Sequence, residues 1–486
     1  MNVLSVVKSH IEKTTMYRTV LYSLMALTAW SLVFSVIGIL DYFVVAMVVQ
    51  LLILLIVGYG ADRLFAAVFK VTPNPESIFV TSFILYFLLI PSGTVQSFIV
   101  AAIAAMVAAA SKYLLVWCGK HITNPAAMGA VIIGLTGIGF AGWWVATLSL
   151  LPFVLIAGAI VLYKTRRYDM VAIYIVVSLV MISAIALMQD RFTLGLLWQA
   201  IVSYPILFLA FFMLTEPQTL APKRQQRNGV AAGVAILAHC QVAIGAVSMT
   251  PEIALVVGNI VSAAFTKTRG FRLMLTSRKK LPGDQVEYVF STDRELKFEA
   301  GQYMELQVPH KKIDARGIRR MFTIASRPGT DSIRLITRHP QPGSSFKNRL
   351  AELPVGRVLR VCGIWGDFVL PRDSSEKLLM IAGGVGITPF LSQLEWLSDQ
   401  NETRDIVLIY GVRNKEDAIR LRGNETGIRV IIHEGPLSQQ DIRGYAKDIH
   451  QRTVYISGPP VMVDAVSRDV RQLGAARVHR DFFAGY

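Results

Sequence analysis

The sequence predicts a polytopic α-helical membrane domain of about ten spans, fused to an antiparallel β-barrel and to a Rossmann-like α/β domain. Hydrophobic residues make up 53% of the 486 residues, and the mean hydropathy is +0.48, whereas a soluble chain of this length carries more charge. Residues 1–269 hold only 16 of the 49 Lys and Arg and 8 of the 33 Asp and Glu. The stretch MIAGGVGITPFLSQLEWL (380–397) is typical of a buried strand, a glycine-rich turn and a helix. We therefore place domains at 1–269, 270–375 and 376–486.

Apolar stretches recur along the first domain with short breaks. They lie at 18–40, 42–69, 76–91, 94–118, 124–140, 143–163, 168–188, 193–214, 228–247 and 250–268. A straight helical crossing takes about 20 residues. The third and fifth stretches are shorter and begin after the breaks TPNPE and ITNP. These two are expected to be half-helices or re-entrant segments.

The connecting loops predict the orientation. Lys and Arg gather in alternate loops, which places both termini and every basic loop in the cytoplasm, in a multi-pass protein of the cell (inner) membrane. The N-terminus lacks a small-residue cleavage site after an apolar run, so we expect it to be retained. Two sets of five spans then run in opposite senses, which permits an inverted repeat, although no clear sequence repeat is visible. Because topology accounts for the basic residues of the first half, nucleic acid is not predicted as the partner behind the +16 net charge.

Few polar residues lie within the spans. His239 is expected in the middle of a helix, as a haem ligand, a proton relay or a histidine satisfied by a neighbouring helix. The only other histidine near a span is His121 at the cytoplasmic edge, so a haem protein is weakly indicated. Glu76 and Glu216 flank the broken segments and either line an ion or flavin site or cap helix ends. The three cysteines form no CxxC pair, and neither an iron–sulfur cluster nor another metal site is predicted.

Residues 281–375 predict the β-barrel, because alternating stretches such as QVEYVFST and QYMELQVP are separated by turn signals. A short basic linker, RGFRLMLTSRKK (269–280), is expected before it. Within the barrel, RRMFTIASRPG places Arg320 to pair with a pyrophosphate. Phe322 offers a flat apolar face for a ring, and Thr323 offers a hydroxyl for a ring nitrogen.

A phosphate-binding helix start is expected next. In QPGSSFKNRL, Gly343, Ser344 and Ser345 precede an amphipathic helix, and serine hydroxyls together with free backbone N–H groups at a helix N-terminus bind phosphate. GIWGDFVL (363–370) then closes the barrel.

The last hundred residues alternate strand and helix, which predicts a parallel sheet. In LLMIAGGVGITP, Gly383, Gly384 and Gly386 let the backbone approach a pyrophosphate, and Thr388 with the following proline starts a helix. A strand is expected at 405–413, ending on Arg413 where a ribose or 2′-phosphate would lie, and another at 453–463.

In this order, these motifs resemble the ferredoxin–NADP reductase superfamily over about 270–486. The resemblance implies FAD on Arg320, Phe322, Thr323, Gly343, Ser344 and Ser345, and NADH or NADPH on Gly383, Gly384, Gly386, Thr388, Arg413, Gly458 and Pro459. Thr323, Ser457 and Tyr486 are the residues expected at the reacting ring. Ser457 stands where the family often has a cysteine close to the hydride-transfer site, and Asp481 where it often has glutamate. Phe482, Phe483 or Tyr486 is expected to cover the flavin ring.

The first half resembles the flavin-carrying membrane subunits of Na+-translocating NADH:quinone reductase and of the Rnf complex. The likeness rests on VTSFILYFLLIPSG (80–93), KHITNPAAMG (120–129) and FFMLTEPQT (211–219). Those subunits carry a covalent FMN on the threonine of an S/T-G-A-T-like motif, which this sequence lacks. No covalent FMN is therefore expected, and a non-covalent FMN or riboflavin near Asn124 or Thr215 is left open.

Together these patterns predict a membrane-bound, NAD(P)H-oxidising flavoprotein. Hydride would reach FAD on the cytoplasmic side, and electrons would pass through the membrane domain to a quinone or an extracytoplasmic acceptor. A second carrier is needed because a membrane interior of about 30 Å is too thick to cross in one step. Three alternatives stay open: redox-driven Na+ or H+ translocation, a membrane-anchored cytoplasmic flavin reductase, and a haem-containing ferric-reductase-like protein. Partner subunits or a homo-oligomer are compatible with each.

Overall fold

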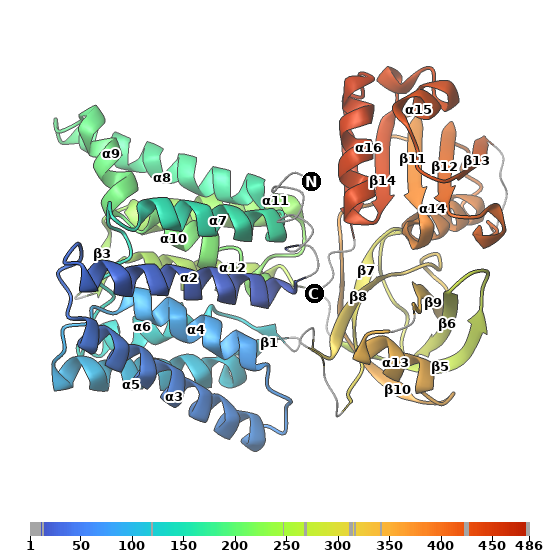
Figure 1. Cartoon of the computed structure of the whole chain (residues 1–486). Coiled ribbons are helices and arrows are strands. Elements are labelled where there is room, and N and C mark those ends of the chain that lie inside the picture. Colours follow the sequence, from blue (N-terminus) through green and yellow to red (C-terminus); the bar gives the residue numbers. More distant parts are fainter. Residues whose placement is uncertain are drawn as a thin grey trace. The chain divides into compact units, whose positions relative to one another are not determined.

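A computed structural model describes residues 11, 14–117, 120–245, 247–266, 270–310, 314, 317–340, 343–421 and 427–482. The chain divides into two compact units, Met1–Lys267 and Thr268–Gly485 (Figure 1).

The first unit consists of helices, coloured blue to green in Figure 1. They are α2 (Met16–Val36), α3 (Val44–Val68), α4 (Pro75–Leu88), α5 (Val95–Leu114), α6 (Pro125–Leu135), α7 (Leu151–Thr165), α8 (Tyr168–Met188), α9 (Leu194–Ser203), α10 (Ile206–Phe208), α11 (Arg224–His239) and α12 (Pro251–Ala264). A π-helix, η1 (Leu209–Met213), and a 3-10 helix, η2 (Pro217–Thr219), follow α10. Two short hairpins complete the unit: β1 (Val116–Trp117) with β2 (Lys120–His121), and β3 (Ala243–Ile244) with β4 (Val247–Ser248).

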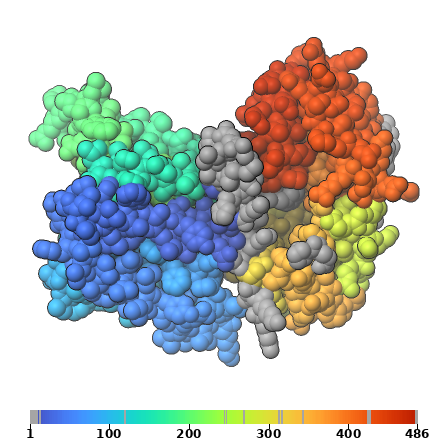
Figure 2. Space-filling model, in the orientation of Figure 1, coloured from blue at the N-terminus to red at the C-terminus, as the bar shows by residue number. Residues whose placement is uncertain are grey.

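Four helices of the described chain, α2, α3, α5 and α8, are long and apolar enough to cross a membrane, and the bent pair formed by α9 and α10–η1 brings the number to five. The structure does not support the predicted number of ten spans. The helices α4, α6, α7 and α12 are apolar, but they are only 11 to 15 residues long. Large apolar side chains are exposed along the long helices, for example Ile56 (69%) and Val176 (59%). Figure 2 shows one face of this unit, coloured blue to green.

The two predicted broken segments are short helices with the same start. Asn74 caps α4 by accepting the backbone N–H of Glu76, and Pro75 fills the first helical position, where no N–H is needed. Asn124 caps α6 by accepting the backbone N–H of Ala127, and Pro125 is the first residue of that helix. At the other end of α4, the side-chain amide of Gln50 donates to the carbonyl of Leu89 at 2.8 Å. A buried side chain thus binds a carbonyl that the helix leaves without an intrahelical partner.

Helix packing repeats between two sets of five. In the first set α3 packs on α5, α5 on α6 and α2 on α4. In the second set α8 packs on α11, α11 on α12 and α7 on α10–η1. The sets meet through α2 with α7 and α6 with α12, the first and the last helices of each.

The prediction that His239 lies in the middle of a helix is wrong. α11 ends at His239, and the chain turns into the β3–β4 hairpin. Gln241 has a φ of +52°, a left-handed conformation that stops the helix.

The second unit, yellow to red in Figure 1, contains two sheets. The first is six-stranded and antiparallel, in the order β8-β7-β10-β5-β6-β9. Its strands are β5 (Phe271–Lys280), β6 (Gln285–Thr292), β7 (Tyr303–Gln307), β8 (Arg319–Thr323), β9 (Ser332–Arg338) and β10 (Val358–Trp365), and the helix α13 (Ser345–Glu352) lies between β9 and β10. The linker predicted at 269–280 is wrong over β5, since Phe271, Leu273 and Leu275 alternate with exposed residues and enter the core.

The second sheet is five-stranded and parallel, in the order β13-β12-β11-β14-β15, as predicted. Its strands are β11 (Leu378–Gly383), β12 (Ile406–Val412), β13 (Ile428–Glu434), β14 (Thr453–Gly458) and β15 (Val478–Phe482), and its helices are α14 (Thr388–Asp399), α15 (Gln439–Tyr445) and α16 (Pro460–Gln472). α14 packs on one face, while α15 and α16 pack on the other. The strand predicted at 453–463 ends at Gly458, since Pro459 and Pro460 break the strand and start α16.

Candidate functional site

The first part of the candidate site joins β8 to the start of α13. The guanidinium of Arg320 donates to the carbonyls of Gly317 (3.1 Å) and Arg319 (2.7 Å) and lies 5.1 Å over the ring of Phe346. These contacts hold Arg320, whose side chain is only 11% exposed, at the N-terminus of α13. A positive charge and a helix N-terminus therefore lie together, as the phosphate-binding prediction requires.

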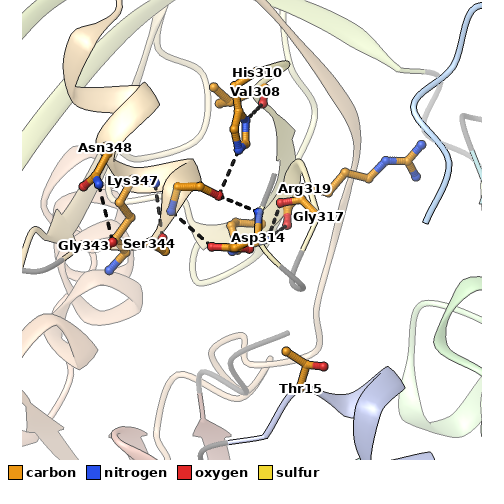
Figure 3. A network of polar contacts seen from close by, with 12 residues as sticks. Thr15, Val308, His310, Asp314, Gly317, Arg319, Gly343, Ser344, Lys347 and Asn348 are labelled. Atoms are coloured by element: carbon orange, nitrogen blue, oxygen red, sulfur yellow. Dashed lines mark hydrogen bonds and ion pairs between the residues drawn. The ribbon is translucent and has the colours of Figure 1, made fainter. Parts of the chain in front are cut away.

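The N-terminus of α13 is ready to accept an anion. Ser344 caps the helix by accepting the N–H of Lys347 at 3.3 Å. The backbone N–H of Ser345 donates to Oδ2 of Asp314 at 3.1 Å, and Nη2 of Arg320 lies 3.2 Å from Oδ1 of the same carboxylate (Figure 3). We call Arg320 and the N–H of Ser345 the anion cradle, because both hold a negatively charged group.

The neighbouring predicted residues have distinct surroundings. Phe322 is buried and packs 5.8 Å from the ring of Phe346, so it contributes to the core beneath the cradle. Thr323 is also buried, and its hydroxyl has no hydrogen-bond partner among the described residues. Gly343 allows a close approach, because a Cβ there would lie 2.3 Å from Oδ1 of Asn348. The orphaned hydroxyl of Thr323 fits a polar ligand atom.

The second part of the site is the glycine turn between β11 and α14. Gly384 has a φ of +54°, which favours glycine. A Cβ on Gly386 would lie 2.3 Å from the carbonyl oxygen of Ser457, and one on Gly383 would lie 2.1 Å from the sulfur of Met462. The hydroxyl of Thr388 donates to the carbonyl of Val385 and closes the turn. The structure thus packs the turn directly on the end of β14, at the carboxyl edge where parallel sheets bind ligands.

The other predicted nucleotide residues surround this edge. Gly458 is buried and Pro459 exposed at the end of β14, while Arg413 is exposed just after β12. Ser457 is fully buried, and its hydroxyl has no hydrogen-bond partner among the described residues. Phe483 and Tyr486 lie outside the described residues.

Asp481 lies beside Ser457, since the two are partners in the β14–β15 ladder. Burial, and secondly the carboxylate of Asp367, raise the pKa of Asp481 to about 7. A carboxyl group next to the end of β14 therefore keeps its proton through the acid range.

This shift predicts how stability depends on pH. The folded chain keeps a proton on Asp481 that the unfolded chain releases near pH 3.8, so stability falls as pH rises from about 4 to about 7. Replacing Asp481 by Asn is expected to remove the fall in stability that Asp481 causes between about pH 4 and pH 7. Melting curves of both proteins between pH 5 and 8 measure it, and parallel curves would contradict the shift.

Sequence reasoning missed the residues that fix α14 to the antiparallel sheet. Ser392 donates to the carbonyl of Ser326 at 2.7 Å, and the Gln393 amide donates to the carbonyl of Phe368 at 2.9 Å. Arg334 on β9 forms ion pairs with Glu287 and, across to α14, with Glu395. No local sequence motif predicts these contacts, because they join residues that are 25 to 66 positions apart in the chain.

In the first unit, Asn124 contacts Glu216, the residue that follows Thr215. The amide of Asn124 donates to Oε2 of Glu216 at 2.8 Å, and His121 lies 2.8 Å from Oε1. The side chain of Asn259 accepts the backbone N–H of Asn124. The hydroxyl of Thr215 itself donates to the carbonyl of Phe211 in η1. A polar cluster therefore joins α6, β2, η2 and α12.

Glu76, at the other broken segment, has a different partner. Its carboxylate forms an ion pair with Arg18 at 2.7 Å in the first turn of α4. Glu76 therefore favours the helix end electrostatically.

Comparisons with known proteins find similarity in the second unit. Residues 380–426 match the family model of the oxidoreductase NAD-binding domain. The glycine betaine monooxygenase reductase subunit of Chromohalobacter salexigens is 30% identical over 203 residues, which cover 37% of this chain and 54% of the relative. The NADH oxidoreductase HCR of Escherichia coli is 27% identical over 195 residues, covering 38% and 59%. The chain thus spans little more than half the length of these relatives.

Among solved structures, the cytochrome P450 reductase GcoB of Amycolatopsis aligns over 44% of this chain and 70% of its own, with 23% identity and a TM-score of 0.40. A ferredoxin NADP+ reductase of Neisseria gonorrhoeae aligns over 45% of this chain and 100% of its own, with 17% identity and a TM-score of 0.38. The family and sequence matches show that the C-terminal part is similar to an oxidoreductase NAD-binding domain and to reductase components, in agreement with its predicted class. The resemblance of the first half to membrane flavin subunits stays a prediction.

Proposed function

We propose that this chain is a membrane-bound NAD(P)H-oxidising flavoprotein with domains at 1–269, 270–375 and 376–486. Hydride from NADH or NADPH passes to FAD on the cytoplasmic side, and electrons leave through the membrane domain to a quinone or an extracytoplasmic acceptor. The observation that carries this proposal is the joint presence, in one compact unit, of the anion cradle and of the glycine turn packed on Ser457. FAD, when bound, accepts hydride and releases electrons singly.

The residues of the first part of the site have proposed roles in FAD binding. The anion cradle and the Ser344 cap bind the FAD pyrophosphate, with Gly343 next to the cap. The orphaned hydroxyls of Thr323 and Ser457 offer hydrogen bonds at the ring system.

The nucleotide is assigned to the carboxyl edge of the unit's parallel sheet, where the glycine turn packs on the end of β14. Its phosphates are placed on the glycine turn and the N-terminus of α14, and its ribose near Arg413. Gly458 and Pro459 form the facing wall, and Phe482, Phe483 or Tyr486 is the proposed cover of the flavin ring.

In the membrane domain, the cluster of Asn124, His121 and Glu216 beside Thr215 is the proposed place for a second, non-covalent flavin, FMN or riboflavin. The repeated helix pairing supports an inverted repeat. In this proposal the long helices each cross the membrane by themselves, and the short helices cross only part of it. Ion translocation and the final acceptor stay predictions.

Counting flavins in the wild type and in Arg320→Ala tests the proposal. The chain purified in detergent is expected to release two flavins, one of them FAD, and Arg320→Ala is expected to release only the other. Loss of FAD follows because the guanidinium of Arg320 supplies the positive charge of the cradle. Extraction, separation and quantification of the flavins measures this. One flavin in the wild type would favour a membrane-anchored reductase, and undiminished FAD in Arg320→Ala would contradict the assigned site.

A further inference from the structure

The anion cradle already holds an anion that belongs to the chain. Both oxygens of the Asp314 carboxylate are bound, Oδ2 by the N–H of Ser345 at 3.1 Å and Oδ1 by Nη2 of Arg320 at 3.2 Å. These are the two donors that the proposed function assigns to the FAD pyrophosphate. One carboxylate therefore spans both parts of the cradle.

A second set of contacts keeps Asp314 at this place. Its backbone N–H donates to the hydroxyl of Ser345 at 3.0 Å, and that hydroxyl lies 3.0 Å from Nε2 of His310. His310 is fixed in turn by a contact between Nδ1 and the carbonyl of Val308 at 2.9 Å. Main chain and side chain of Asp314 thus engage the first residue of α13 together, so the carboxylate is directed at the cradle by its own backbone.

We propose that Asp314 is an internal competitor for the flavin pyrophosphate and sets the affinity of the chain for FAD; this inference rests on the proposed flavin site. A helix N-terminus and a guanidinium bind carboxylate and phosphate by the same charge-assisted hydrogen bonds, so the two anions exclude each other. FAD binds only the fraction of molecules in which Asp314 has left, and its apparent dissociation constant rises by the reciprocal of that fraction. Asp314 thus discriminates against ligands whose phosphate charge is too small to displace it.

FAD affinity of the deflavinated full-length chain tests the proposal. We compare the wild type with Asp314→Asn and with Asp331→Asn, which removes the same charge from an exposed position before β9. Titrations followed by flavin fluorescence are expected to give about tenfold tighter binding for Asp314→Asn, the order of one charge-assisted hydrogen bond, and no change for Asp331→Asn. Stopped-flow mixing is expected to place the gain in the association rate, because release of Asp314 precedes binding.

The other outcomes are distinct. Weaker binding in Asp314→Asn would mean that the carboxylate orients Arg320 for the flavin, and would overturn competition. Equal tightening in both variants would reduce the effect to net charge and would overturn it too. Failure of the wild type itself to bind FAD would instead overturn the flavin site, so the two failures are separable.

Discussion

Replacing Gly386 by alanine is expected to lower the rate of NADH-dependent flavin reduction by on the order of 100-fold, while FAD stays bound. The new Cβ would lie 2.3 Å from the carbonyl oxygen of Ser457 and 2.7 Å from Cα of Gly458. Both neighbours are backbone atoms at the end of β14, so relief requires the glycine turn and the strand to separate. A displacement of about 1 Å at a site of hydride transfer costs a factor of this size, because the reacting atoms no longer align.

The matched control is Gly444→Ala in α15. A Cβ at Gly444 meets nothing within 4 Å, and alanine suits a helix better than glycine. Stopped-flow bleaching of the oxidised flavin after mixing with NADH measures both variants, and bound FAD is quantified beforehand. A wild-type rate in Gly386→Ala would show that the nucleotide does not use this turn.

Replacing Arg334 by methionine is expected to lower the free energy of unfolding of the C-terminal unit by about 3–5 kcal/mol, the usual effect of removing one partner from a buried charge network. Arg334 is 8% exposed, pairs with Glu287 on β6 and Glu395 on α14, and donates to the carbonyl of Ala325 at 2.8 Å. Its loss leaves two carboxylates in a poorly solvated position without their shared guanidinium. α14, whose first residue follows the glycine turn, loses the ion pair that joins Glu395 to β9.

Arg338→Met is the control for the same substitution at a solvated pair. Arg338 bonds to Asp284 at 2.8 Å, but both side chains are 36% exposed, and such surface pairs contribute about 0–1 kcal/mol. Denaturant unfolding of the full chain, followed by release of flavin fluorescence, gives both free energies. Equal losses in the two variants would mean that the Arg334 network carries no special weight.

Local sequence patterns were enough to predict much of the secondary structure of the second unit. Alternation predicted the antiparallel strands, and alternating strands and helices predicted the parallel sheet. The glycines at 383, 384 and 386 predicted the turn. Each of these depends on residues close in the chain, where backbone preference and side-chain period act directly. The same reasoning failed at 269–280, because a basic stretch resembles a linker even when its apolar residues alternate into a core.

The sequence by itself determined that this chain joins a highly apolar helical half to a reductase-like half, since composition and ordered motifs are local properties. Only the tertiary structure decided where α11 ends, that Asn124 binds Glu216, and that Arg334 fixes α14. It alone placed the carboxylate of Asp314 in the anion cradle. These contacts join residues that are distant along the chain, and a single acidic side chain in a loop carries no periodicity or motif. The role proposed for Asp314 depends on the donors that folding brings next to its carboxylate, Arg320 and the N–H of Ser345.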